Sequence, residues 1–196
     1  MSILVYLNLQ RIRVPRQANT ANLIYKASSE KTIRHHPIGE DILSIAEIIV
    51  KDSFRFDYMR IMRDFFVHYF SRMIWSIVTA NDGMSFITSD NPVSFYNESV
   101  LPPSEPGIGF YGTRVLFPIT KKHLLILTHP EFERGEKYAT EQISEEVLID
   151  YCSIEVRSGA KSGKEFVTTQ NQVMFLLSDE GIVDESEEVL RDAIQT

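Results

Sequence analysis

Apolar side chains recur at helical spacing through the first 80 residues. The pattern predicts a helix over residues 2–28 that Pro15 ends or kinks, because proline has no amide donor and crowds the preceding turn. A second, amphipathic helix is predicted over residues 42–50. The strongest pattern covers residues 56–79, which contain no glycine or proline. Because its apolar stripe is wide, we expect a long helix that is buried on most of its circumference.

Beyond Gly83 the pattern changes to short apolar runs separated by turn residues. Residues 85–88 and 93–96 predict two short strands on either side of a polar turn. Residues 114–117 and 123–128 predict the two strands of a β-hairpin. The middle of the chain is therefore expected to form a sheet.

The segments after the sheet give mixed signals. Residues 102–109 are rich in proline and glycine and predict a loop, and residues 141–156 predict a helix. The stretch 158–164 is basic and rich in small residues, but it lacks the spacing of a phosphate-binding loop, so we expect a mobile loop. Residues 166–177 fit either a strand or a helix, and residues 186–194 fit either a short acidic helix or a frayed tail.

Helices thus precede a mixed region, which indicates an α+β fold rather than alternating β and α units. We expect an N-terminal helical layer with a long buried helix, followed by a small, mostly antiparallel sheet and a C-terminal helix. The 196 residues suffice for one domain with its own core. Within that domain we distinguish a helical part (1–82), a mixed part (83–178) and an acidic tail (179–196).

The net charge of −7 hides an uneven distribution. Residues 1–36 carry six basic side chains and one acidic, a balance of +5, whereas residues 129–196 carry six basic and 16 acidic, a balance of −10. We expect these charges to be solvated or to pair between the two ends of the chain. Arginines of the first helix could contact phosphates, but the acidic remainder and the lack of interleaved aromatic residues disfavour nucleic acid as a partner.

The composition bears on compartment and cofactors. No apolar run approaches the roughly 18–20 residues of a membrane-spanning helix, and the chain starts without the basic leader and cleavage site of a signal peptide. Cys152 is the only cysteine, which excludes a disulfide within the chain and suits a reducing compartment. We expect a cytoplasmic protein without membrane contact. The histidines show no zinc-binding spacing, so the sequence predicts no metal or cofactor.

The polar turn Ser89–Pro92 carries the candidate chemistry. Its Asp and Asn side chains can hydrogen-bond their own backbone, and Pro92 biases Asn91 toward an extended or turn conformation. Asp90 is the best candidate for a catalytic carboxylate, with Ser89 and Asn91 beside it as binding residues. The partners that we expect for it are binding residues late in the first helix: Gln10, Arg11, Arg13 and Arg16. The simpler alternative is structural, with Asp90 accepting backbone amides and pairing with an arginine to hold the helix against the sheet.

Three segments together resemble one known family. They are Leu9–Arg16 in the first helix, the turn segment Phe86–Val93, and the segment Leu116–Leu125. Their order and spacing are similar to those of the bacterial domain-of-unknown-function family 4238, over residues 5–130. The resemblance implies a shared fold and a shared polar centre, and it brings no established reaction.

Two differences from the family pattern lead to an expectation about partners. Family members usually carry a further segment before the first helix, and the C-terminal pattern is matched only loosely by Asn171 and residues 174–178. If the absent segment normally covers the helix at 2–28, that helix exposes an apolar face. We therefore expect a homo-oligomer, or a partner protein, to cover it.

Two functions of different classes follow from these residues. The first is a binding or accessory module in which Gln10, Arg11, Arg13 and Asp90 organise the fold and an exposed surface meets a partner. The second is a metal-assisted hydrolase or nuclease in which Asp90 and the basic helix share a phosphate-containing substrate. We favour the first, because the sequence shows neither a metal-ligand set nor a nucleophile–base pair.

Overall fold

The structure is a computed structural model that describes residues 3–51, 53–62, 64–134 and 154–194. Its helices are α1 (Ile3–Ile12), α2 (Pro15–Arg34), α3 (Gly39–Ile45), α4 (Ser53–Met62), α5 (Phe65–Phe70), α6 (Pro130–Arg134), α8 (Lys164–Leu176) and α9 (Glu187–Ile194). Its strands are β1 (Ile74–Ala80), β2 (Thr88–Ser89), β3 (Ser94–Tyr96), β4 (Arg114–Thr120), β5 (His123–Thr128), β6 (Val156–Ser162) and β7 (Ile182–Val183). The arrangement confirms the predicted α+β class.

The strands form one five-stranded sheet and one small sheet. The large sheet has the order β3-β4-β5-β1-β6, and β2 pairs with β7 in the small one. All pairs in the large sheet are antiparallel except β1 with β6, which is parallel. The expectation of a mostly antiparallel sheet is therefore confirmed.

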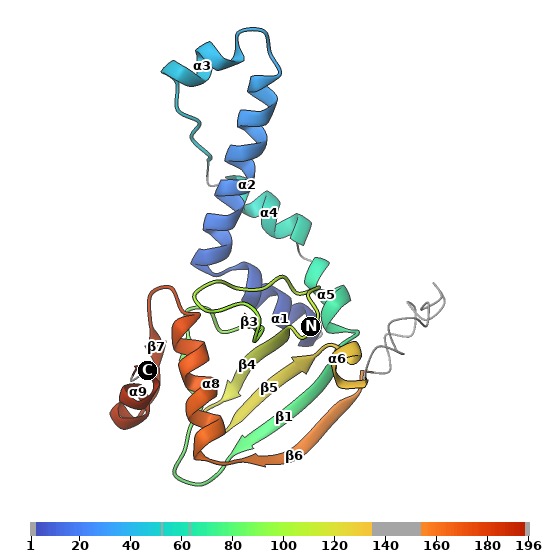
Figure 1. Ribbon diagram of the computed structural model, residues 1–196, viewed down its shortest axis with the longest axis vertical. Helices are drawn as coiled ribbons and strands as arrows, with labels where there is room; N and C mark the ends of the chain where they lie inside the picture. The colour runs from blue at the N-terminus through green and yellow to red at the C-terminus, as the bar shows by residue number, and fades with distance from the viewer. Residues whose placement is uncertain (1–2, 52, 63, 135–153, 195–196) are drawn as a thin grey trace.

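Each face of the large sheet is covered by helices, with α8 lying across one of them (Figure 1). Alternate side chains of a strand point to opposite faces, and β4 follows this rule. Val115 and Phe117 pack with residues of α1 and α5, whereas Leu116 packs with residues of α8 and α9. The core thus has two layers, and α1 is fixed directly against the sheet.

A helical arm, defined here as residues 15–62, extends away from the sheet (Figure 1). It consists of α2, which runs outward, α3 near the tip, and a return segment that leads into α4. Pro15 is the first residue of α2. The fixed φ of proline suits the first turn of a helix, where no amide donor is required, so Pro15 separates α1 from the arm.

The predicted long helix over 56–79 is wrong in its second half. Helices α4 and α5 occupy residues 53–62 and 65–70, and residues 74–80 form strand β1. A short apolar run fits a buried strand as well as a helix, and the β-branched residues of this run favour the strand. Residues 74–80 pair with β5 on one side and with β6 on the other, and this pairing selects the strand over the helix. The expected burial is also wrong, because Phe56 and Ile61 are exposed.

The remaining helical predictions hold in part. The helix predicted over 2–28 is present as α1 and α2, with the break at Pro15, and α2 continues to Arg34. The helix predicted over 42–50 is shorter and earlier, because α3 ends at Ile45 and Ala46 is extended. For residues 166–177 and 186–194, each of which had two interpretations, the structure shows the helix: α8 ends at Leu176 and α9 begins at Glu187.

The strand predictions hold in part. The hairpin β4–β5 is confirmed, and the strand predicted over 93–96 is present as β3, which pairs with β4. Of the strand predicted over 85–88, only Thr88 lies in a strand, β2, which continues to Ser89 and pairs with β7. The loop predicted over 158–164 is wrong, since residues 156–162 form β6. Gly159 has a φ of +93° where the register of β6 on β1 shifts, so glycine permits a bulge there. The helix predicted over 141–156 lies outside the described residues apart from its last residues, where Val156 begins β6.

Candidate functional site

A buried ion pair joins α1 to the proline-rich loop that follows β3. Arg11 lies in the last turn of α1 with 3% of its surface exposed. Its Nη1 and Nη2 atoms donate to Oε1 and Oε2 of Glu105 at 3.0 and 2.6 Å, which is the bidentate geometry of a strong arginine–carboxylate pair. The guanidinium also lies 4.2 Å from the centre of the Phe95 ring. Arg11 therefore binds the helix, the strand and the loop together.

The polar turn completes this centre through Asn91. The Asn91 side chain accepts a hydrogen bond from Arg11 Nη1 at 3.0 Å and donates to Glu105 Oε1 and to the Leu177 carbonyl, each at 3.1 Å. The Ser89 hydroxyl accepts a hydrogen bond from the Asn91 backbone amide at 3.1 Å. Asn91 is fully buried, and its hydrogen bonds connect α1, the loop and the end of α8.

The charge of Glu105 is stabilised by its neighbours. Burial by itself raises the pKa of this carboxyl, but the Arg11 charge and the hydrogen bonds from Arg11, Phe95 and Asn91 outweigh it, so the pKa lies below its ordinary value of 4.5. The Phe95 backbone amide donates to Glu105 Oε1 at 3.1 Å. Glu105 is therefore a charged partner of Arg11 at neutral pH and holds no proton to donate.

The lowered pKa of Glu105 predicts a loss of stability in acid. A carboxyl whose pKa is lower in the folded state adds stability above its unfolded pKa, and this contribution is lost as the pH falls toward the folded pKa. We expect the free energy of unfolding, measured by urea titration between pH 7 and pH 3, to fall from about pH 4.5 downward. The Glu105→Gln variant should show a shallower fall over that range. Equal slopes for the two proteins would contradict this role for Glu105.

The other predicted site residues lie around this centre in different roles. Asp90 does not supply the carboxylate partner of Arg11. Its Oδ1 and Oδ2 accept hydrogen bonds from the backbone amides of Asp179 and Glu180 at 3.1 and 3.0 Å. Arg16 pairs with Asp179 at 3.0 Å and approaches Glu105 Oε2 at 3.5 Å. The expected Asp90–arginine pairing is thus replaced, for Arg11 and Arg16, by Glu105 and Asp179.

Gln10 and Arg13 flank Arg11 on the chain but differ in environment. Gln10 is buried in α1, and Arg13 is exposed in the short link between α1 and α2. Of the residues predicted for the site, the structure thus brings Arg11, Asn91 and Ser89 into one hydrogen-bonded network. Asp90 is adjacent to Ser89 and Asn91 in the chain, but its carboxylate accepts hydrogen bonds from the segment after α8 instead.

Sequence reasoning missed Glu105. It lies in a loop with no periodic pattern, and its partner Arg11 is 94 positions away. A weak signal was present, because Glu105 is the one acidic residue of the proline- and glycine-rich stretch at 102–109. Such a loop has few other polar side chains, so a carboxylate in it is available to a buried arginine.

A cleft of about 600 Å³ opens beside the ion pair, and we call it the arginine cleft. It lies where the arm meets the sheet and the loop. It is lined by Arg11, Arg16, Gln17, Thr20, Phe65, Phe66, Tyr69, Phe95, Pro103, Glu105, Pro106, Gly107, Ile108 and Gly109. Arg11 Nε and Arg16 Nη1 are buried and form no hydrogen bond with the described residues, although Arg16 Nη1 lies 3.5 Å from Glu105 Oε2. The cleft therefore combines aromatic walls with two arginines, of which Arg16 has 22% of its side-chain surface exposed.

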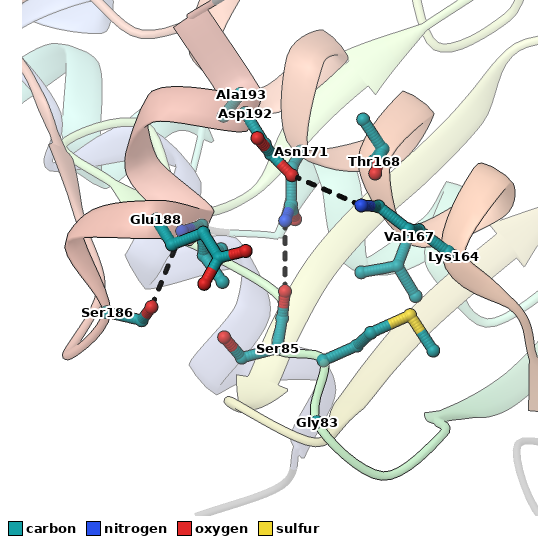
Figure 2. A pocket seen from close by; sticks show the side chains of 12 residues that line it. Gly83, Ser85, Lys164, Val167, Thr168, Asn171, Ser186, Glu188, Asp192 and Ala193 are labelled. Carbon is teal, nitrogen blue, oxygen red and sulfur yellow. Dashed lines mark hydrogen bonds and ion pairs between the residues drawn. The ribbon is translucent and has the colours of Figure 1, made fainter.

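A second, smaller cavity of about 140 Å³ lies between α8, α9 and the turn at Gly83–Ser85 (Figure 2). The polar groups around it are largely paired with each other. Asn171 Nδ2 donates to the Ser85 carbonyl at 2.9 Å, and Lys164 lies 3.8 Å from Asp192. Asn171 Oδ1 also accepts the Ile87 amide at 3.1 Å. This cavity is a joint between α8, α9 and the strand segment rather than a candidate site.

Two further properties concern only the described part of the chain. No three His, Cys, Asp or Glu side chains lie close enough in it to hold a metal ion together. None of its helices has the length and apolar character needed to span a membrane.

Of the comparisons with known proteins, the one with family models gives a match. A family model described as "Protein of unknown function (DUF4238)" matches residues 5–188. No curated protein and no solved structure matches the chain. The family match contains all three motif segments, the Arg11–Glu105 pair and the arginine cleft. Because it covers nearly the whole length, this chain belongs to the DUF4238 family of proteins of unknown function.

Proposed function

We propose that this protein is a binding module and that its ligand is a small molecule held in the arginine cleft. The observation that carries the proposal is a cleft with aromatic walls that two arginines, Arg11 and Arg16, also line, the Arg16 side chain being 22% exposed. A ligand oxygen that accepts from the accessible part of the Arg16 guanidinium gains a charge-assisted hydrogen bond.

The size and lining of the cleft favour a compact, flat ligand. Pockets for small molecules typically measure about 300–1,000 Å³ and are lined mainly by apolar and aromatic groups with a few polar ones. The cleft volume of about 600 Å³ lies within this range. Phe65, Phe66, Tyr69 and Phe95 offer ring surface for an aromatic or other planar body.

The charge of the site limits the charge of the ligand. Arg11 is paired with Glu105, and Arg16 lies between Glu105 and Asp179. Two positive groups thus face two negative ones, so the site does not favour a polyanion such as a nucleoside triphosphate. A ligand with one carboxylate or one carbonyl oxygen on a planar apolar body fits the donors without excess negative charge.

The hydrolase alternative depends on Asp90, and no observation favours it over binding. Both carboxylate oxygens of Asp90 already accept backbone amides. Such a carboxylate caps a turn and is poorly placed to activate a water or to hold a metal ion. Asp90 is also not among the residues that line the cleft.

The probe that tests the proposal is 1-naphthoate, a planar apolar molecule with one carboxylate. Calorimetric titration should give a Kd of about 1 mM or tighter. Gly109→Leu should weaken binding at least tenfold, because a Cβ at Gly109 lies 3.7 Å from the Tyr69 ring and a larger side chain there fills the cleft. 1-Naphthylmethylamine has the same shape but carries donors instead of acceptors, so it should bind at least tenfold more weakly than 1-naphthoate.

Gly181→Leu is the matched control. A Cβ at Gly181 meets no atom within 4 Å, and this residue does not line the cleft. The control protein should bind 1-naphthoate as the unmodified protein does. Absence of 1-naphthoate binding, or equal binding by the Gly109 variant, would overturn the proposal.

A further inference from the structure

Asp179 places a negative charge on Arg16 from outside the arginine cleft. Arg16 Nε donates to Asp179 Oδ1 at 3.0 Å. Arg16 lines the cleft, whereas Asp179 does not. The two side chains are only 22% and 26% exposed, so solvent screens this pair incompletely. A ligand that binds Arg16 therefore feels the charge of Asp179 without touching it.

The charge balance of the cleft depends on Asp179. The charged residues that line the cleft are Arg11, Arg16 and Glu105, a balance of +1. Glu105 is engaged by Arg11 through two hydrogen bonds, of 3.0 and 2.6 Å, and is farther from Arg16, at 3.5 Å. Asp179 is thus the carboxylate that compensates Arg16, and it brings the balance to zero.

The backbone that carries Asp179 is held in place by the polar turn. The segment between α8 and β7 (Figure 1) runs beside this turn, and the Asp90 carboxylate accepts hydrogen bonds from the amides of Asp179 and Glu180 at 3.1 and 3.0 Å. The Asp90 amide donates to the Gly181 carbonyl at 3.3 Å, and β2 pairs with β7 directly afterwards. Exposed ion pairs lose much of their effect to side-chain entropy. Here the backbone is fixed, which keeps the Asp179 carboxylate on Arg16.

We infer that Asp179 determines the charge specificity of the arginine cleft, limiting it to ligands with at most one negative charge, and that Asp90 is the positioning residue that holds Asp179 against Arg16. This inference rests on the binding function proposed above. Two unit charges about 8 Å apart, at an effective permittivity of about 40, change an equilibrium constant about fivefold. Each negative charge on a ligand should therefore cost about that factor in affinity while Asp179 is charged.

The test compares three planar ligands of similar shape by calorimetric titration of the full chain. 1-Naphthamide is neutral, 1-naphthoate carries one negative charge and naphthalene-1,4-dicarboxylate carries two. The affinity of each anion is expressed relative to that of 1-naphthamide, so a general change in the cleft, which affects all three ligands, cancels. In the Asp179→Asn variant the relative affinity should rise about fivefold for 1-naphthoate and about 25-fold for the dicarboxylate.

Glu180→Gln is the matched control. Glu180 is exposed and follows Asp179 directly in the chain, but it is not one of the two carboxylates that pair with Arg16. The control removes the same charge and should change the relative affinities less than twofold. An equal change in the control, or unchanged relative affinities in Asp179→Asn, would overturn the inference and leave the proposed function standing. If the unmodified protein binds none of the three ligands, the proposed function fails first.

The role of Asp90 is tested by combining variants. Asp90→Asn keeps the size of the side chain but offers one acceptor oxygen in place of two, so Asp179 should be held less firmly. The relative affinities for the anions should rise, in the same order as in Asp179→Asn. Because Asp90 acts through Asp179, the double variant Asp90→Asn with Asp179→Asn should match Asp179→Asn alone. Effects that multiply would mean that Asp90 acts by its own charge, which would overturn its positioning role.

Discussion

Replacing Glu105 with glutamine should lower the free energy of unfolding by about 3–5 kcal/mol, because removal of one member of a buried ion pair leaves the other charge uncompensated. Arg11 would remain 97% buried in the folded state without its negative partner. Glutamine has nearly the same shape as glutamate, so the loss reports the charge and the hydrogen bonds rather than packing. Urea denaturation at pH 7 measures the change.

The control for this prediction is Glu98→Gln. Glu98 pairs with Arg114 at 3.3 Å, but this pair lies at the surface. Exposed ion pairs contribute about 0–1 kcal/mol, so the control should change little. A second check is the double variant Arg11→Met with Glu105→Gln, which removes both charges. It should lose less stability than the sum of its two single variants. A loss below 1 kcal/mol for Glu105→Gln alone would mean that the pair does not stabilise the junction.

Truncation of Phe70 should have a comparable effect. Phe70 is fully buried, and its ring lies 6.0 Å from that of Phe66 and 6.4 Å from that of Phe95. Phe70→Ala leaves a cavity between α5 and the sheet, which costs about 3–5 kcal/mol. For a protein of this size such a loss lowers the Tm by roughly 6–20 °C. Differential scanning calorimetry measures it.

Phe110→Ala is the matched control for the core truncation. Phe110 has the same side chain but is 60% exposed, so its loss should change the free energy of unfolding by about 0.5 kcal/mol or less. If both variants lost the same stability, the layer between α5 and the sheet would not be the core that the packing indicates.

The fold could be predicted from the sequence where the pattern had one interpretation. Residues 114–117 and 123–128 are two apolar runs on either side of a turn, and they form the predicted hairpin. Pro15 constrains the backbone locally, and the helix breaks there. Residues 74–79 were misassigned because a short apolar run satisfies both the helical and the strand period. Only the pairing of Ile74–Ala80 with β5 and β6, which depends on residues far along the chain, selects the strand.

The candidate site could be predicted in part. The polar turn was expected to meet the end of the first helix through Asp90 and one of the residues Gln10, Arg11, Arg13 or Arg16. The two segments do meet, but through Asn91, whose side chain accepts a hydrogen bond from Arg11 at 3.0 Å. Glu105 was not expected, since a loop has no periodicity from which the direction of a side chain could be inferred. Asp90 and Glu105 both carry a carboxylate, so the side-chain type does not distinguish them. Only the fold determines that Glu105 pairs with Arg11, whereas Asp90 accepts hydrogen bonds from backbone amides.

The position of β1 in the sheet has a consequence for synthesis on the ribosome. Strand β1 ends at Ala80, whereas its neighbours begin at His123 and Val156. At about 5–20 residues per second, β1 emerges several seconds before β5 and longer before β6. During that interval only the helices that precede β1 in the chain, such as α1 and α5, can cover its apolar side chains. A nascent chain that ends before Val156 therefore displays an unpaired strand edge, which is the kind of segment that chaperones bind and that aggregates in their absence.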